Sequence, residues 1–209
     1  MAIFVVIQAC KQYGGFAQDE KSSRVAVSSA APLRALVTPD FLMNNSSKKI
    51  VSRGSLCERV AEWRRDGERV ILTNGCFDLL HVGHIRYLRG AKALGGKLIV
   101  AINADDSVRQ IKGEGRPLMP AMERAEIIAA LSDVDAVVIF DEPDVRALIR
   151  EIHPDVQAKG TDYTHENVPE RDEVLAYGGR VEIVGDPKDH STTDFLARLK
   201  SWNAGRSKR

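Results

Sequence analysis

Two histidines separated by two residues mark the stretch of this sequence with the clearest chemical potential. His81 and His84 follow an apolar run, 70–72, and a polar segment that contains Gly75, and Gly83 lies between them. A spacing of three residues places both imidazoles on one face of a helical turn. A helix N-terminus also offers unpaired N–H groups and a partial positive charge, which favour phosphate. The stretch therefore predicts a strand, a tight turn and a helix start that hold an anion whose charge grows during a reaction.

Other roles for this histidine pair fit its surroundings less well. Two histidines could bind a metal ion, but a zinc site needs a third or fourth ligand and none is spaced nearby, so we expect no protein-bound metal. A single histidine in a turn is usually structural. The stretch also lacks the glycine pattern of dinucleotide-binding turns and the pattern of a P-loop. Because the strand, the glycines and the histidine spacing agree, the pattern favours phosphate chemistry.

Apolar runs alternate with helical patterns on both sides of the histidine stretch. We expect strands over 70–72, 98–102, 134–140, 156–159 and 181–184, and helices over 82–94, 122–131, 144–152, 171–177 and 191–199, with a further helical pattern from 56. Strands that alternate with helices imply parallel pairing and right-handed crossovers. The fold class predicted is therefore α/β, a Rossmann-like doubly wound parallel sheet. Its ligands should bind beyond the carboxyl ends of the strands, where polar residues after several strands can meet.

Two later segments supply polar groups to that rim. The segment 159–163, Lys-Gly-Thr-Asp-Tyr, follows a predicted strand. Its glycine lets the backbone approach a ligand, and Asp162 could accept a hydrogen bond from one, although an Asx turn explains Asp162 equally well. The hydroxyls of Ser191, Thr192 and Thr193 precede the last predicted helix. They could cap that helix, hold phosphate oxygens, or do both, and the helix terminus favours phosphate.

Positive charge near the rim is predicted on a glycine-containing loop. Lys112 and Arg116 could bring a point charge and a guanidinium fork to phosphates, or they could be ordinary solvated charges. Arg124 follows and could be structural. Cys76 lies beside the histidines, and we interpret it as a small residue in a tight turn because no activating base is evident.

Composition limits the remaining possibilities. The 209 residues carry a formal net charge of +1 and are 44% hydrophobic, which suits one α/β domain with its own core. Near-neutral charge gives no support for a nucleic-acid partner, and no apolar run approaches membrane-spanning length. Three cysteines without a C-x-x-C pattern make a disulfide framework unexpected. We therefore expect a cytoplasmic protein with neither a nucleic-acid nor a membrane partner.

The two ends of the chain differ from its middle. Residues 1–50 contain serine pairs and a polar run at 44–49, which predict a poorly ordered extension or an upstream start assigned in error. Residues 51–201 carry the α/β pattern and form the predicted domain. Residues 202–209 are expected to be a flexible basic tail.

The histidine stretch resembles the H-x-G-H motif of the nucleotidyltransferase superfamily. Together with 159–163 and 191–193, the segment 73–78 is similar to the adenylyltransferase domain of ADP-heptose synthases, and the resemblance covers about 56–199. It implies transfer from ATP, with Mg²⁺, to the sugar 1-phosphate D-glycero-β-D-manno-heptose 1-phosphate, giving ADP-heptose and pyrophosphate for lipopolysaccharide core synthesis. Related enzymes are often dimers or larger, so a homo-oligomer is expected.

The resemblance also implies roles for particular residues. His84 would act on the α-phosphate, His81 on the neighbouring phosphate oxygens, and Lys112 as a catalytic cation. The residues implied to contact the nucleotide are Thr73, Asn74, Gly75, Cys76, Phe77, Gly83, Asn103, Arg116, Lys159, Gly160, Asp162, Ser191, Thr192 and Thr193. A cytidylyltransferase of the same superfamily, acting on glycerol 3-phosphate or ethanolamine phosphate, remains the alternative. A non-catalytic nucleotide-binding module would not need the intact motif with its basic and hydroxyl partners.

Overall fold

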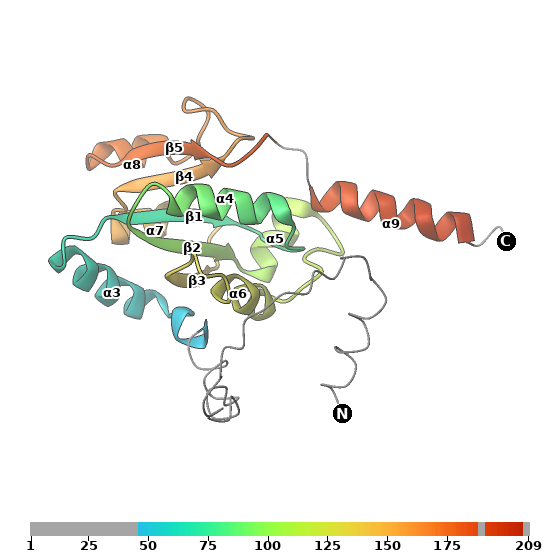
Figure 1. Ribbon diagram of the computed structural model, residues 1–209, viewed down its shortest axis with the longest axis horizontal. Helices are drawn as coiled ribbons and strands as arrows, with labels where there is room; N and C mark the ends of the chain where they lie inside the picture. The colour runs from blue at the N-terminus through green and yellow to red at the C-terminus, as the bar shows by residue number, and fades with distance from the viewer. Residues whose placement is uncertain (1–45, 188–190, 207–209) are drawn as a thin grey trace, which may run out of the picture. The chain divides into compact units, whose positions relative to one another are not determined.

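A computed structural model describes residues 46–187 and 191–206. Its strands are β1 (Val70–Gly75), β2 (Lys97–Asn103), β3 (Ala136–Phe140), β4 (Val156–Gly160) and β5 (Arg180–Val184). They form one parallel sheet in the order β3-β2-β1-β4-β5 (Figure 1). The chain runs outward from β1 to β3 and then returns to place β4 against the other side of β1. The predicted doubly wound α/β sheet is therefore confirmed, and its switch point lies between β1 and β4.

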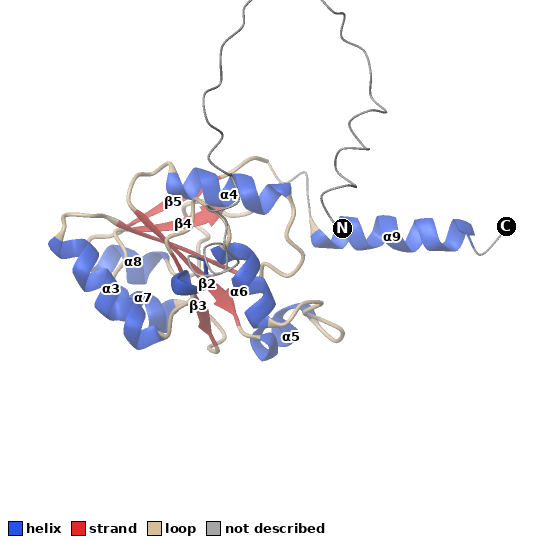
Figure 2. Cartoon of the chain, turned by 60° about the horizontal axis from the view of Figure 1, so that its bottom comes forward, coloured by secondary structure: helices blue, strands red, loops and turns tan. Residues whose placement is uncertain are grey.

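The helices cover both faces of this sheet. They are η3 (Ser47–Lys49), α3 (Arg53–Arg65), α4 (Val82–Lys92), α5 (Asp105–Lys112), α6 (Ala121–Ala129), α7 (Arg146–Ile152), α8 (Arg171–Ala176) and α9 (Thr192–Arg206). Side chains of a strand alternate between the two faces. Leu72 accordingly packs with α3, α7 and α8, whereas Ile71 packs with α4 and α6. Figure 2 shows these helices around the sheet.

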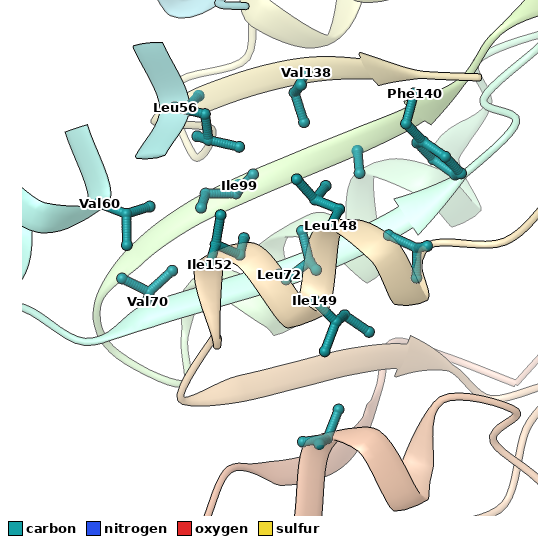
Figure 3. Packing of buried hydrophobic residues seen from close by; sticks show 14 of the residues in the cluster. Leu56, Val60, Val70, Leu72, Ile99, Val138, Phe140, Leu148, Ile149 and Ile152 are labelled. Carbon is teal, nitrogen blue, oxygen red and sulfur yellow. The ribbon is translucent and has the colours of Figure 1, made fainter. Parts of the chain in front are cut away.

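The core under α3 and α7 is made mainly of branched aliphatic side chains. Leu148, Ile149 and Ile152 of α7 lie over Leu72 and Ile99 of the central strands (Figure 3). All five are at most 1% exposed. Burial of each such side chain stabilises the fold by about 1.5–3 kcal/mol, so the central strands form a rigid support for the residues that follow them.

The folded part begins earlier than the sequence predicted. Ile50 forms a parallel bridge with Val137, and the Val51 N–H donates to the Val137 carbonyl (2.9 Å). Lys49 Nζ donates to the Leu131 carbonyl (2.8 Å). These contacts cover the outer edge of β3, so the predicted boundary at residue 50 falls inside a structured segment. The rest of the predicted extension, residues 1–45, lies outside the described residues.

The last helix extends further than the sequence predicted. The tail expected to be flexible from 202 is helical as far as Arg206. Phe195, Leu199 and Trp202 recur at helical spacing, which continues the pattern past the predicted end at 199. Residues 207–209 lie outside the described part of the chain. Within that part, no helix has the length and apolar character needed to cross a membrane.

Candidate active site

A cavity of about 590 Å³ lies at the carboxyl ends of the strands, where the sequence predicted a ligand. Asn74 and Gly75 of β1, Asn103 of β2, and Lys159 and Gly160 of β4 contribute to its wall. The other predicted site residues that line it are Cys76, Phe77, His81, Gly83, His84, Lys112, Arg116, Asp162, Ser191, Thr192 and Thr193.

Thr73 is the predicted site residue that the cavity does not include. Its side chain is fully buried, and its hydroxyl donates to the Ile99 carbonyl (3.3 Å). Thr73 therefore belongs to the buried sheet, because its hydroxyl is already bonded to the neighbouring strand β2.

His84 is held as a neutral imidazole at the start of α4. Its Nδ1 accepts a hydrogen bond from the His81 backbone N–H (3.3 Å), so the ring proton lies on Nε2. The His81 and His84 rings stack with centroids 3.9 Å apart. Burial, and secondarily the charge of His81, lower the pKa of His84 to about 4. Near neutral pH, His84 can therefore donate a hydrogen bond from Nε2 to an anion.

Phe77 fixes the turn that precedes α4. Its φ of 47° lies in the left-handed region, which is uncommon for a residue with a side chain. The Phe77 ring is buried, with its centroid 5.2 Å from that of His84 and 6.5 Å from that of Tyr87. A Cβ at position 75 would come within 3.2 Å of this ring, so glycine leaves room for it. The Tyr87 hydroxyl donates to the Ala158 carbonyl (2.7 Å), which ties α4 to β4.

Asp78 anchors the loop between α5 and α6 beside the histidines. Its Oδ1 accepts from the Leu118 N–H (2.7 Å) and the Met119 N–H (3.1 Å). Its Oδ2 lies 2.7 Å from Arg116 Nε, and the Asp78 side chain is only 2% exposed. Arg116 lines the cavity from this loop. Asp78 thus places Arg116 near the turn that precedes α4 and has both oxygens engaged in doing so.

Arg124 serves the structure and does not line the cavity. Its guanidinium is buried, donates to the carbonyls of Met119 (2.9 Å) and Cys76, and pairs with Asp105 (2.7 Å). It joins the β1 turn to the starts of α5 and α6. Burial raises the pKa of the Cys76 thiol, which disfavours a nucleophilic thiolate and agrees with its interpretation as a turn residue.

The start of α9 frames one end of the cavity. Ser191, Thr192 and Thr193 line it, and the Thr192 hydroxyl donates to the Leu79 carbonyl (3.4 Å) in the turn before α4. The Thr161 hydroxyl donates to the Asp186 carbonyl (2.6 Å), which joins the loops after β4 and β5. Residues 188–190 of the predicted loop lie outside the described residues. Two helix starts, those of α4 and α9, therefore meet at the same opening, an arrangement that suits several phosphate groups.

The region between β1 and β4 contains a buried carboxylate, that of Glu170, which the sequence did not reveal. Lys159 Nζ lies 3.3 and 3.2 Å from the two carboxylate oxygens of Glu170. It also donates to Asn74 Oδ1 (3.1 Å) and lies 4.7 Å from the Tyr163 ring centroid. Lys159 therefore lines the cavity as predicted, but with its charge already compensated. Glu170 follows Pro169 in an irregular loop, where no periodicity or motif distinguishes it from a surface carboxylate.

Potential metal ligands do not gather in the described residues. No group of three or more histidine, cysteine, aspartate or glutamate side chains is placed there to hold an ion. Asp78, the carboxylate beside the histidines, is committed to Arg116 and two backbone N–H groups. The donor set around His84 consists of hydrogen-bond donors and cations, which suits phosphate oxygens.

Comparisons with known proteins agree with this geometry. The model of the cytidylyltransferase-like family matches residues 72–202. A "Bifunctional protein HldE" from Koribacter versatilis (strain Ellin345) is 50% identical over 150 residues, which cover 72% of this chain and 31% of that protein. A protein of the same name from Rhodopseudomonas palustris (strain BisA53) is 44% identical over 173 residues, covering 83% and 35%. This chain thus spans about a third of the length of these relatives.

A solved structure is also similar. The crystal structure of the lipopolysaccharide core biosynthesis protein from Thermoplasma volcanium GSS1 aligns with 30% identity and a TM-score of 0.49, covering 56% of this chain and 95% of that one. Because the family match alone includes more than half of the chain and contains both helix starts that open the cavity, the protein belongs to the cytidylyltransferase-like family of nucleotidyltransferases.

Proposed function

We propose that this chain transfers the adenylyl group of ATP to D-glycero-β-D-manno-heptose 1-phosphate, giving ADP-heptose and pyrophosphate. The observation that carries the transfer chemistry is the neutral His84 at the start of α4, beside the start of α9 at the same cavity. Likeness to the HldE proteins, at 41–50% identity, supports the choice of nucleotide and sugar. Because the chain spans about a third of those proteins, the substrates are proposed for this chain and tested below.

The proposed reaction is a single in-line displacement. An oxygen of the sugar phosphate attacks the α-phosphorus of ATP and forms a new P–O bond. The bond from that phosphorus to the oxygen bridging to the β-phosphate breaks, and pyrophosphate leaves with that oxygen and its electron pair. The nucleophile is already anionic, so no general base is required. The enzyme must position both substrates and stabilise the charge that develops.

The chain offers hydrogen-bond donors for this charge. His84 Nε2–H would bind the α-phosphate in the transition state, and His81 would lie at the neighbouring oxygens. Lys112 would approach from the end of α5 and Arg116 from the α5–α6 loop that Asp78 anchors, and the start of α9 would hold the β- and γ-phosphates. These groups line the same cavity. Preorganised donors of this kind stabilise a transition state more than the substrate, because they need not reorganise as charge appears.

Magnesium would enter as part of the Mg·ATP substrate. Its usual ligands in nucleotide complexes are phosphate oxygens and water, with one or two carboxylates. Both oxygens of Asp78 are already bonded to Arg116 and to backbone N–H groups. At the histidine end of the cavity, the phosphates would therefore be the main ligands of the magnesium ion. The ion would neutralise charge on the phosphate oxygens, and the protein groups would orient the α-phosphorus toward the acceptor.

Nucleotide choice separates this proposal from the alternative cytidylyltransferase. Adenine and cytosine differ in size and in their hydrogen-bonding edges, so a pocket shaped for one leaves polar groups unpaired with the other. A penalty of about 1–3 kcal/mol corresponds to about 5- to 150-fold in kcat/KM, and we expect kcat/KM to favour ATP over CTP by at least about tenfold. Pyrophosphate release with heptose 1-phosphate and each nucleotide in turn measures this ratio. Equal use of both nucleotides, or preference for CTP, would refute adenylyl transfer and leave nucleotidyl transfer standing.

A further inference from the structure

The cavity has a second polar region whose charges cancel. We call it the β1–β4 floor and define it by Asn74, Lys159 and Glu170, all of which line the cavity. The side chains of Lys159 and Glu170 are each 4% exposed and form an ion pair. Burying two charges is costly, and a buried pair is retained only where its geometry is good. The proposed phosphate chemistry gives this pair no role.

The pair determines how the Asn74 side chain is turned. Asn74 Oδ1 accepts from Lys159 Nζ (3.1 Å) and from Gln157 Nε2 (2.9 Å). An ammonium group can only donate, so it must meet the amide oxygen and not the amide nitrogen. Asn74 Nδ2 is therefore directed away from Lys159. No described residue accepts a hydrogen bond from Nδ2, and Asn74 is half-buried at the cavity wall.

We propose that Asn74 Nδ2 donates to a hydroxyl group of the acceptor sugar, and that Lys159, neutralised by Glu170, is a positioning residue for it. This inference rests on the proposed function and adds a specificity-determining contact to it. A donor backed by a neutral pair suits an uncharged hydroxyl, whereas a phosphate is better matched by the cations at the histidine end.

In-line chemistry assigns the floor to the acceptor side. The attacking oxygen and the leaving pyrophosphate must lie on opposite sides of the α-phosphorus. The start of α9 lies beside the turn before α4, through Thr192 and Leu79, and holds the leaving side. We assign the acceptor to the part of the lining built by the segments after β2, β3 and β4, which contributes Asn103, Pro143, Asp144, Pro169 and Glu170.

Arg146 connects two of the loops that form this part of the lining. Arg146 at the start of α7 binds Asp144 (2.8 Å), the Pro169 carbonyl (2.6 Å) and Glu173 (3.1 Å). It therefore ties the loop after β3 to the loop after β4. A floor whose side chains are already oriented can discriminate between acceptors, because a missing hydroxyl leaves a fixed donor unpaired.

The decisive experiment combines one variant with altered acceptors. Wild type and Asn74→Ala are assayed by pyrophosphate release with ATP and with sugar 1-phosphates that each lack one hydroxyl. We expect Asn74→Ala to raise KM for the intact acceptor about tenfold and to leave KM for ATP within about twofold. At least one monodeoxy acceptor should bind wild type about tenfold more weakly, and that penalty should disappear in Asn74→Ala.

The positioning role needs a second variant and a matched control. Glu170→Gln removes the countercharge of Lys159, so the Asn74 amide should lose its fixed orientation and acceptor KM should rise about threefold or more. Glu182→Gln is the control, because Glu182 is paired with Arg180 on β5 (3.0 Å) outside the cavity lining. In an Asn74→Ala background, Glu170→Gln should raise acceptor KM no further. An additional rise there would show that Glu170 does not act through Asn74.

The outcomes distinguish this inference from the proposed function. If wild type adenylates no sugar 1-phosphate, the proposed function fails and the acceptor contact fails with it. If wild type is active but Asn74→Ala keeps its acceptor KM, only the inference is overturned. A rise in KM for ATP instead of the acceptor would also overturn it, because it would place Asn74 on the nucleotide. Should Glu170→Gln not fold, the Asn74 and monodeoxy comparison still decides.

Discussion

Helices α4 and α9 both present their N-termini to the cavity, but the fold holds them very differently. α4 is buried along one side through Leu88 and Ala91, and Tyr87 fixes it to β4. α9 touches the turn before α4 through Thr192, while Phe195, Leu199 and Trp202 are 53%, 43% and 58% exposed. The sequence predicted phosphate binding at both helix starts. The structure shows that they differ in how firmly each helix is packed against the sheet.

This contrast suggests a division of labour at the phosphates. A helix start that is fixed before substrate arrives can stabilise a transition state without reorganisation, so α4 should control the chemical step. Elements that bind ligands are often less firmly packed than the core, and their contacts with the ligand order them. α9 should then contribute mainly to nucleotide binding. The following experiments test this division.

Removal of His84 should have the largest effect. His84→Ala deletes the donor on the fixed helix, and we expect kcat to fall about a hundredfold or more, equivalent to about 2.7 kcal/mol of transition-state stabilisation. KM for both substrates and the circular dichroism spectrum should change little. His165→Ala is the matched control, since His165 is exposed and lies outside the cavity lining. A folded His84→Ala enzyme with near-normal kcat would remove α4 from the chemical step.

The burial of the His84 ring at the start of α4 can be measured through the pH dependence of stability. The pKa of His84 is about 4 in the fold and 6.5 when unperturbed, so the unfolded state binds the proton more tightly between these values. The free energy of unfolding should therefore fall as pH drops from 6.5 toward 4, by about 2–3 kcal/mol through this group alone. Urea denaturation at pH 7 and pH 4.5 measures the change.

Comparison of two variants isolates the His84 contribution to that change. His84→Asn should lose about 2–3 kcal/mol less than wild type between the two pH values, whereas His165→Asn should follow wild type. Equal losses in wild type and His84→Asn would mean that His84 is not buried as a neutral ring, which would weaken the contrast with α9.

A smaller effect is expected at α9. Thr192→Val keeps the branched shape but removes the hydroxyl, so KM for ATP should rise about five- to tenfold with kcat within about threefold. Ser201→Ala, on the same helix and bonded locally to the Arg198 carbonyl (2.8 Å), is the control and should leave both constants unchanged. A large fall in kcat with unchanged KM would contradict the division of labour.

The smallest effect is expected from shortening the chain at its beginning. A protein starting at Met43 keeps Lys49 and the Ile50–Val137 bridge that cover the edge of β3. Neither α4 nor α9 has a described contact that requires the earlier residues, so activity and melting temperature should stay within error of the full chain. Failure of the shorter protein to fold would show that the first 42 residues belong to the domain.

The sequence predicted most of the fold because apolar runs and helical spacing are local signals. Leu98 to Ile102 is apolar throughout, as a strand buried on both faces must be, and it became β2. The strand order, and with it the switch point between β1 and β4, came from the structure, because no local pattern says which strands pair. The early start of the fold was missed because Ile50 is held by a bridge to Val137 of the edge strand β3. A contact between residues so far apart in the chain leaves no local sequence pattern.

The candidate site was predicted where residues follow strands and missed where they depend on tertiary partners. His81, His84 and the hydroxyls at 191–193 line the cavity as expected. Thr73 lies outside the cavity because its hydroxyl is bonded to the Ile99 carbonyl of β2, a tertiary contact that the motif does not report. Glu170 became visible only when its loop was placed against Lys159, since a buried ion pair between distant residues has no sequence signature.

The hydrogen bonds that orient Asn74 also have a consequence for how the protein is made. Asn74 is joined to residues 83 and 85 positions later in the chain, Gln157 and Lys159. Contacts of such long range form late in folding, because the intervening loop must be closed first. During synthesis, the turn with the two histidines leaves the ribosome well before β4. A chain cut short ahead of β4 would therefore carry the H-x-G-H motif but lack the floor that discriminates between acceptors.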